Sequence, residues 1–314
     1  MTNSLKYFLK FPTWFTVILG FSLLIWQIIG GTISQNIQLL FFSALILLTG
    51  IPHGSLDHLI QEAYDKRQNK AYNFTKFMLQ YLSIMAIYGL AWYFFSGLSL
   101  MIFIIISAWH FGETDLENVP PQSKMWAFTR LVYGFYILSF ILLTHVKEVN
   151  PIVQEMIEGQ GRAITIWKFI QQNTKQILYL FGLLLCTIFI VSQSEHLVVF
   201  NKIRIFRLFL ILFLSAFLPL LPAFALYFGG WHALCAFDNI HGYLRKDYPT
   251  LTLKSIYLKS LPFSVLAFIF LGIFLWYCHN YTRFYNPFPI LFIFISLITL
   301  PHLVITSRMN NNKK

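Results

Sequence analysis

Four of the nine histidines in this 314-residue chain lie inside long apolar runs: His53, His110, His232 and His302. Imidazole is the commonest metal ligand in proteins, and it suits iron, zinc and copper. An ionisable side chain at membrane depth is costly, so it is first interpreted as functional. Any one of these histidines taken alone is more often hydrogen-bonded to a neighbouring helix. Four of them at one depth would instead indicate a shared metal site.

Each of the four histidines has small or helix-bending neighbours. Such neighbours let a backbone come close to another helix or to a ligand. The motifs are Pro52-His53-Gly54-Ser55-Leu56-Asp57-His58, Trp109-His110-Phe111-Gly112, Gly229-Gly230-Trp231-His232 and Pro301-His302.

Carboxylates accompany two of these motifs. Asp57 follows His53 by four residues, so on a continuous helix the two share a face, and the carboxylate can orient a ligand imidazole. His58 lies well round such a helix and is a weaker ligand candidate. Glu113 and Asp115 are candidates for the same orienting role, but a solvated inner loop is the favoured interpretation. The remaining histidines, at span ends or in loops, are expected to be interfacial or solvated: His145, His196, His241 and His279.

An aromatic group precedes His232: Phe224, Tyr227, Phe228 and Trp231. Most aromatic side chains of a membrane protein face lipid or pack in the core. Beside a metal they would suit a long, flat, apolar substrate, so these four are the candidate substrate-binding residues.

The composition predicts the elements that must position these side chains. Hydrophobic residues make up 57% of the chain and charged residues only 11%, against about 25% in a soluble domain. We expect an all-α, polytopic membrane helix bundle, a single domain over residues 1–314 with short tails at each end. The net charge of +11 is spread between apolar runs, which argues against nucleic acid binding. Cys186, Cys235 and Cys278 have no Cys-x-x-Cys spacing, so we expect free thiols.

About ten spans are predicted, and the first is expected to remain a span rather than to be cleaved as a signal peptide. Pro219 and Pro222 separate the seventh span from the eighth, or else kink one long helix and reduce the count to nine. The ranges are 12–30, 37–60, 76–95, 97–114, 126–146, 175–193, 204–219, 221–241, 261–279 and 287–306.

The basic residues predict the orientation. With both termini in the cytoplasm, eighteen of the 23 Lys and Arg residues fall on the inner side. The five exceptions are Lys147, Arg162, Lys168, Lys175 and Arg283, and most of them lie in segment 147–175, which is interpreted as a re-entrant or surface helix. The protein is thus expected in the inner (plasma) membrane. The four histidines within predicted spans then lie about 16 to 24 Å below the outer ends of their spans, which is compatible with one site.

These motifs, in this order over about residues 45–305, resemble the bacterial and archaeal β-carotene 15,15′-dioxygenase family, the bacteriorhodopsin-related-protein type. The resemblance implies a membrane enzyme that uses Fe(II) and dioxygen to cleave β-carotene, or a related polyene, into two molecules of retinal. It implies His53, His110 and His232 as iron ligands, and it makes a rhodopsin that takes up retinal a candidate partner.

The chain departs from the family pattern at one position. The family continues from the His232 motif to a second histidine one helical turn on, where this chain has Ala236. Alanine cannot bind metal, so a four-ligand set is incomplete unless His302, His58 or Asp57 completes it. A three-histidine site with open positions is also chemically reasonable. Three alternatives remain. One is a family member that binds carotenoid or retinal without cleaving it, and another is a histidine-box oxidase prompted by the spacing of His53 and His58. The third is a transporter, against which the sequence shows neither repeated halves nor an intramembrane acidic pair.

Overall fold

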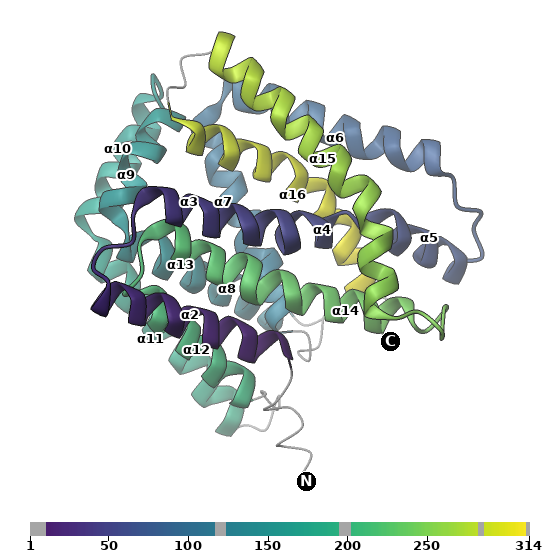
Figure 1. Ribbon diagram of the computed structural model, residues 1–314, viewed down its shortest axis with the longest axis horizontal. Coiled ribbons are helices and arrows are strands. Elements are labelled where there is room, and N and C mark those ends of the chain that lie inside the picture. Colours follow the sequence, from purple (N-terminus) through teal and green to yellow (C-terminus); the bar gives the residue numbers. More distant parts are fainter. Residues whose placement is uncertain (1–10, 117–123, 195–201, 282–285, 312–314) are drawn as a thin grey trace.

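The computed structural model describes residues 11–116, 124–194, 202–281 and 286–311 (Figure 1). These residues form helices and contain no β-strand, which confirms the all-α prediction. In chain order, with η marking π-helical turns, the elements are α2 (Phe11–Ile29), α3 (Gln35–Leu45), η1 (Ile46–Gly50), α4 (Ile51–Gly54), α5 (Asp57–Arg67), α6 (Phe74–Phe94), α7 (Ser96–Asp115), α8 (Lys124–Thr144), α9 (Val146–Met156), α10 (Gly161–Gln172), α11 (Thr174–Ser194), α12 (Lys202–Ser215), α13 (Leu220–Tyr227), η2 (Phe228–Ala233), α14 (Leu234–Leu244), α15 (Leu253–Tyr281) and α16 (Pro287–Asn311).

Eight helical stretches within the described part of the chain are long and apolar enough to cross a membrane. They coincide with eight of the ten predicted spans. The other two predicted spans correspond to shorter apolar helices, Trp14–Ile29 and Ile205–Ser215. The chain is therefore a helical bundle with eight candidate membrane spans, and the count of ten stays a prediction for these two.

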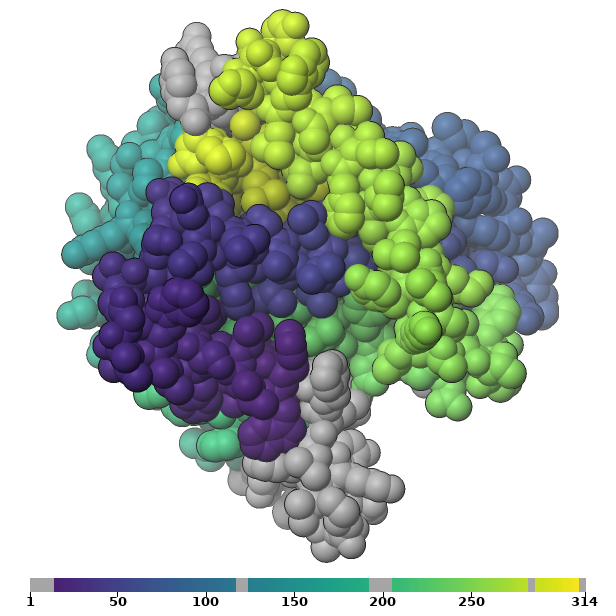
Figure 2. Space-filling view, in the orientation of Figure 1, coloured from purple at the N-terminus to yellow at the C-terminus, as the bar shows by residue number. Residues whose placement is uncertain are grey.

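Most of the helices lie side by side along the long axis of the molecule (Figure 1). The helices α9 and α10 gather at one end, whereas α5 and the α14–α15 connection lie at the other. The last helix, α16, is central: it contacts α5, α6, α7, α9 and α15. Figure 2 shows α16 as a narrow yellow strip between α3 and α15 on this face, and few of the described residues of α16 are exposed.

The chain reverses at the Pro219 turn, so the single-kinked-helix alternative is wrong. Helix α12 ends at Ser215, α13 begins at Leu220, and the two pack against each other. The backbone N–H of Leu220 donates to the Glu148 carboxylate (3.0 Å). The Nε2 of His145 lies 2.7 Å from the carbonyl oxygen of Leu218. His145 is buried, which corrects its interpretation as interfacial or solvated, because it ties α9 to this turn.

Segment 147–175 forms two short helices, α9 and α10, instead of a span. Helix α9 buries Val149, Ile152 and Met156 against the bundle, whereas none of the residues of α10 is buried. The prediction of a surface or re-entrant helix thus agrees with the position of this pair at one end of the bundle (Figure 1).

Helices α7 and α8 pack at very short range. A Cβ atom at Gly112 would overlap the backbone carbonyl of Arg130, and one at Gly134 would overlap that of Ala108. Small residues at such crossings let helix backbones touch, which is how helices commonly associate inside membranes. This packing fixes the end of α7 that carries His110.

Candidate metal centre and substrate cavity

The structure brings the four intramembrane histidines together. His53 lies on α4, His110 on α7, His232 in the turn η2 and His302 on α16. All four are buried, with at most 5% of each residue exposed. Their ring centroids are 5.1 Å apart for His53 and His302, 5.6 Å for His53 and His232, 4.8 Å for His110 and His232, and 5.0 Å for His110 and His302.

Three of these rings, those of His53, His110 and His232, form a group that could hold one metal ion. Their ligand atoms all lie within 4.8 Å of one another, and the Nε2 atoms of His110 and His232 are 3.1 Å apart. Two imidazole nitrogens that each bind one ion at about 2.1 Å lie about 3.0 Å apart at a right angle and about 3.4 Å apart at the tetrahedral angle. The His110–His232 separation therefore fits two ligands of one metal.

His302 is oriented by Asp57. Its Nδ1–H donates to Oδ1 of the Asp57 carboxylate at 2.7 Å, and the Tyr81 hydroxyl donates to Oδ2 at 3.1 Å. Metal-binding histidines usually donate their other ring N–H to a carboxylate or a carbonyl in this way. The expected carboxylate–imidazole pair is thus present, but its imidazole belongs to His302 rather than to His53, because the helix is interrupted at Ser55 and Leu56 before Asp57.

The other ring nitrogen of His302 is Nε2, and the His302 ring lies 5.1 Å from that of His53 and 5.0 Å from that of His110. This Nε2 atom is buried and has no hydrogen-bond partner among the described residues. A buried polar atom without a partner is costly unless something else satisfies it. A metal ion shared with His53, His110 and His232 would satisfy it. A donor set of buried imidazoles is compatible with a metal such as Fe(II).

Both π-helical turns of the described chain lie at this centre. The turn η1 directly precedes the helical turn of His53, η2 contains His232, and the two turns contact each other. The Thr49 hydroxyl donates to the carbonyls of Leu45 (2.6 Å) and Gly229 (3.0 Å), which joins the turns. Single π-helical turns are rare and occur frequently at functional sites. Here one turn precedes the helix of His53 and the other contains His232.

His58 lies outside the histidine cluster. Its Nδ1 is 3.1 Å from the carbonyl oxygen of Ser55, and its ring packs on Phe263 at 4.4 Å. Among the described residues, His58 therefore contacts Ser55 and Phe263 rather than the ring of His53. The histidine pair on which the histidine-box hypothesis rests does not form.

Asp115 is buried instead of solvated, which corrects its interpretation. Its carboxylate accepts hydrogen bonds from the hydroxyls of Tyr133 (3.1 Å) and Tyr227 (3.2 Å) and from the indole N–H of Trp231 (3.2 Å). These bonds anchor the helix of His110 to α8 through Tyr133, and to the end of α13 and the turn η2 through Tyr227 and Trp231. Glu113 is also buried and accepts a hydrogen bond from the Ser307 hydroxyl (3.2 Å).

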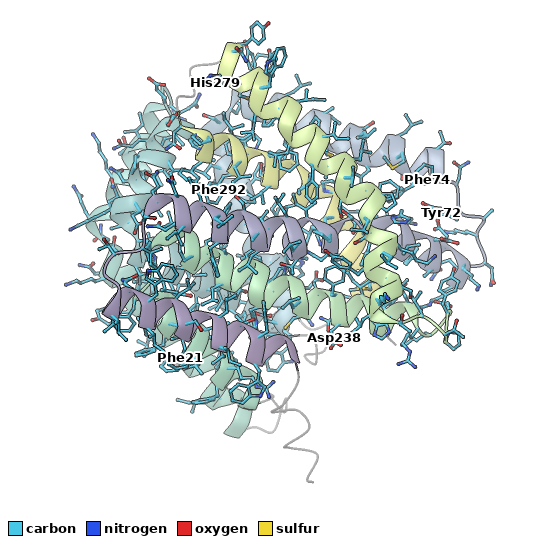
Figure 3. All side chains as sticks on the ribbon, viewed as in Figure 1. Phe21, Tyr72, Phe74, Asp238, His279 and Phe292 are labelled. Atoms are coloured by element: carbon cyan, nitrogen blue, oxygen red, sulfur yellow. The ribbon has the colours of Figure 1, made fainter. Side chains whose placement is uncertain are left out.

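The histidine cluster borders a cavity of about 460 Å³. Its wall is mostly apolar and includes His53, His110 and His302. A cavity of this size and character is typical of sites for apolar small molecules. Figure 3 shows Phe292, one of its lining residues, inside the bundle, whereas the labelled His279 lies at the far end of α15.

Two of the four candidate substrate-binding aromatic residues line this cavity. Phe224 and Phe228 do so, and their rings are stacked at 5.5 Å. Tyr227 and Trp231 are not among the lining residues that the structure describes, because they turn toward Asp115. The members of each pair are four residues apart, and the structure turns one pair toward the cavity and the other toward Asp115.

The fold and the site together define a helical membrane protein with a buried four-histidine centre at an apolar cavity. The chain matches the family of beta-carotene 15,15′-dioxygenases over residues 44–310, and it belongs to that family. It is also similar to a beta-carotene 15,15′-dioxygenase of uncultured marine bacterium 66A03, with 28% identity over 116 residues. This alignment spans 37% of the chain and 42% of the relative, so it covers less than half of either protein. No solved structure matches the chain.

Three features of the site were not predicted from the sequence. They are the pairing of Asp57 with His302, the role of Asp115 as a shared acceptor, and the part of Tyr81 in holding Asp57. One signal pointed toward Asp115: it follows His110 by five residues within a motif rich in small and polar residues.

Proposed function

We propose that this protein is an integral membrane dioxygenase that uses non-haem iron to cleave β-carotene, or a related carotenoid, at the central 15,15′ double bond into two molecules of retinal. One observation supports this most directly. Beside an apolar cavity, three buried histidines each offer a ligand nitrogen, and these atoms lie within 4.8 Å of one another. Family membership supports the choice of reaction.

The iron would be held by His53, His110 and His232, with His302 as the fourth imidazole. Bound iron(II) would supply the redox chemistry that lets dioxygen react with a double bond, one oxygen atom going to each carbon. Four neutral nitrogen ligands leave coordination positions open for dioxygen. Asp57 would fix the tautomer and direction of the His302 ring.

The cavity residues would bind the polyene and exclude water. Phe224 and Phe228 offer flat faces, and the ring of Phe228 lies 5.7 Å from that of His232 and 6.0 Å from that of His53. A conjugated chain in contact with these rings would therefore lie at the metal centre. A dry, lipid-embedded cavity also keeps reactive oxygen species away from water.

The substrate and the product are both soluble in the bilayer, which agrees with a plasma membrane location. Both termini would lie in the cytoplasm, as the distribution of Lys and Arg predicts. A rhodopsin in the same membrane would be a suitable acceptor for the retinal.

The test combines iron analysis with product formation. The purified protein should contain iron and should form retinal from β-carotene under reducing, aerobic conditions. His53→Ala, His110→Ala and His232→Ala should each abolish retinal formation and lower the iron content, because each removes a ligand. His279→Ala, a change at an exposed histidine at the end of α15, is the matched control and should behave as the wild type.

A wild-type protein that holds no iron and forms no retinal would reject the proposal. Full turnover in one of the three variants would show that its histidine is not a ligand. His302→Ala tests the fourth position: a loss of bound iron would support His302 as the replacement for the missing histidine.

Ala236 motivates a second candidate, a protein of this family that binds carotenoid without cleaving it. Ala236 is buried on α14, one helical turn beyond His232. If the site is incomplete, Ala236→His should create or greatly raise retinal formation. If His302 completes the site, the same change should leave the rate unchanged or lower it, and this is the outcome we expect. Ala236→Gln, which adds bulk without an imidazole, is the control.

A further inference from the structure

Some of the residues that line the cavity also reach the surface of the bundle. Nearly all of the residues that line the cavity are buried or only partly exposed. A strongly exposed lining residue must therefore also face the outside of the bundle. Three lining residues differ: Leu82 is 52% exposed, Leu266 is 54% exposed and Phe270 is 40% exposed. These side chains therefore contact both the cavity and the outside, and they mark its mouth.

The mouth lies between two helices, because Leu82 belongs to α6 whereas Leu266 and Phe270 belong to α15. Both helices are candidate membrane spans, and only 17% of the span window in α6 and 11% of that in α15 is buried within the bundle. The helix α16 packs against both of them, and its residues Ile295 and Ile298 form part of the cavity wall. A mouth bordered by apolar side chains on two such helices faces the hydrocarbon core of the bilayer.

The mouth lies near the histidines along the bundle axis. The ring of Phe270 contacts that of Phe294 at 5.7 Å, and the Tyr81 hydroxyl, one residue before Leu82, reaches the carbonyl of Ile298 at 3.4 Å. His302 follows Phe294 by eight residues and Ile298 by four, which corresponds to about 12 and 6 Å along α16. A rigid, elongated molecule entering here would meet the histidine centre within a short distance.

We infer that the substrate enters sideways from the hydrocarbon core of the membrane, through the opening between α6 and α15 that Leu82, Leu266 and Phe270 border. This inference rests on the proposed function for the identity of the substrate, a long apolar polyene. An apolar molecule dissolved in the bilayer gains nothing by crossing water, so a lateral opening is the direct path to the cavity. The rest of the cavity continues toward α9, where Ile152 and Met156 line it.

The test measures loading of the cavity without turnover. Purified protein in lipid nanodiscs is mixed, in the absence of oxygen, with phosphatidylcholine vesicles that contain β-carotene. The carotenoid that stays with the protein after affinity purification is measured by absorbance over time. Leu82→Trp and Leu266→Trp narrow the mouth and should slow loading several-fold. Leu266→Ala should load as fast as the wild type or faster.

Matched controls lie on the same helices. Leu79 on α6 is 63% exposed and Ile269 on α15 is 55% exposed, and neither lines the cavity. Leu79→Trp and Ile269→Trp should load as the wild type does, because they add the same bulk to the lipid-facing surface away from the mouth. The iron content of all variants should be unchanged.

Equal loading in the mouth variants and the controls would overturn lateral entry at this place, and so would a wild-type protein that takes up no β-carotene. If the proposed function is wrong, the experiment gives a different result. A protein that loads β-carotene with the expected variant pattern, but forms no retinal once oxygen is admitted, would contradict the cleavage reaction and leave the route of entry standing.

Discussion

At the scale of single residues, the pairing of Asp57 with His302 has the largest consequence for the site. The two side chains are 245 positions apart and meet at 2.7 Å within the buried bundle. A buried carboxylate is costly unless hydrogen bonds compensate it, and here His302 and Tyr81 supply them. In return the carboxylate fixes the orientation of the His302 ring, whose Nε2 has no hydrogen-bond partner among the described residues.

Asp57→Asn tests this role. The amide keeps the size of the side chain but loses its charge, so it orients His302 less firmly. We expect iron affinity to fall by about 10- to 100-fold, as is typical when a partner of a ligand imidazole is changed. The measurement is iron retention against a competing chelator, with the melting temperature recorded in parallel.

Asp65→Asn is the control, since Asp65 lies on the same helix α5 and accepts a hydrogen bond from Gln61 away from the cluster. Equal iron retention in Asp57→Asn and in the control would show that the Asp57–His302 pair does not support a metal.

At the scale of elements, breaks in helices position the centre. The turns η1 and η2 accompany His53 and His232, and Thr49 joins them through the Gly229 carbonyl. Gly229 is needed at this contact, because a Cβ atom there would lie 2.8 Å from that of Leu45. The close approach of the two broken helices thus depends on a residue without a side chain.

The α7–α8 contact makes an element-scale prediction. Gly134→Ala puts a methyl group where the Ala108 carbonyl lies, so the helices must separate. Overpacking of this kind costs about 1 to 3 kcal/mol, and more where backbone must move. We expect a lower melting temperature in detergent and a loss of retinal formation, because α7 carries His110.

Gly272→Ala on α15 is the matched control. No atom outside the helix lies within 4 Å of a Cβ atom built at Gly272. Alanine also favours a helix over glycine by about 0.5 to 1 kcal/mol. A Gly134→Ala protein as stable as Gly272→Ala would mean that α7 and α8 do not pack as closely as described.

At the scale of the whole molecule, the bundle has two different ends. The amphipathic pair α9 and α10 lies at one end, and α5 with the α14–α15 connection at the other (Figure 1). The second end also carries the ion pair of Arg67 with Asp247. The predicted orientation puts this basic end in the cytoplasm.

Reporter fusions test this orientation. A fluorescent protein that folds only in the cytoplasm, fused after Lys314, should fluoresce. Alkaline phosphatase, which is active only outside the cytoplasm, should be active when fused after Gln172 at the end of α10 and inactive when fused after Tyr248. The reverse pattern would overturn the predicted orientation.

Much of the fold could be predicted from the sequence. Runs of about twenty apolar residues can be stable as helices in lipid, since every backbone group must be hydrogen-bonded within the segment. The predicted spans 97–114 and 126–146 therefore coincide with α7 and α8 to within a few residues. The reversal at Pro219 was left open, because proline either kinks a helix or ends it.

The candidate site could be predicted only in part. The histidines stood out because an imidazole among apolar residues needs a reason to be there. The positions of Asp57, Asp115, Tyr227 and Trp231 could not be predicted in the same way. Each depends on the rotation of one helix against another, and a break of a few residues, as at Ser55 and Leu56, changes that rotation.

The sequence by itself determined that apolar helices carry histidines at a similar depth, because hydropathy and spacing are properties of each segment alone. The tertiary structure decided which side chains meet. It paired Asp57 with His302 and turned Phe224 and Phe228 toward the cavity and Tyr227 and Trp231 toward Asp115. Contacts between distant helices depend on tilt, rotation and close backbone packing, which a linear pattern does not contain.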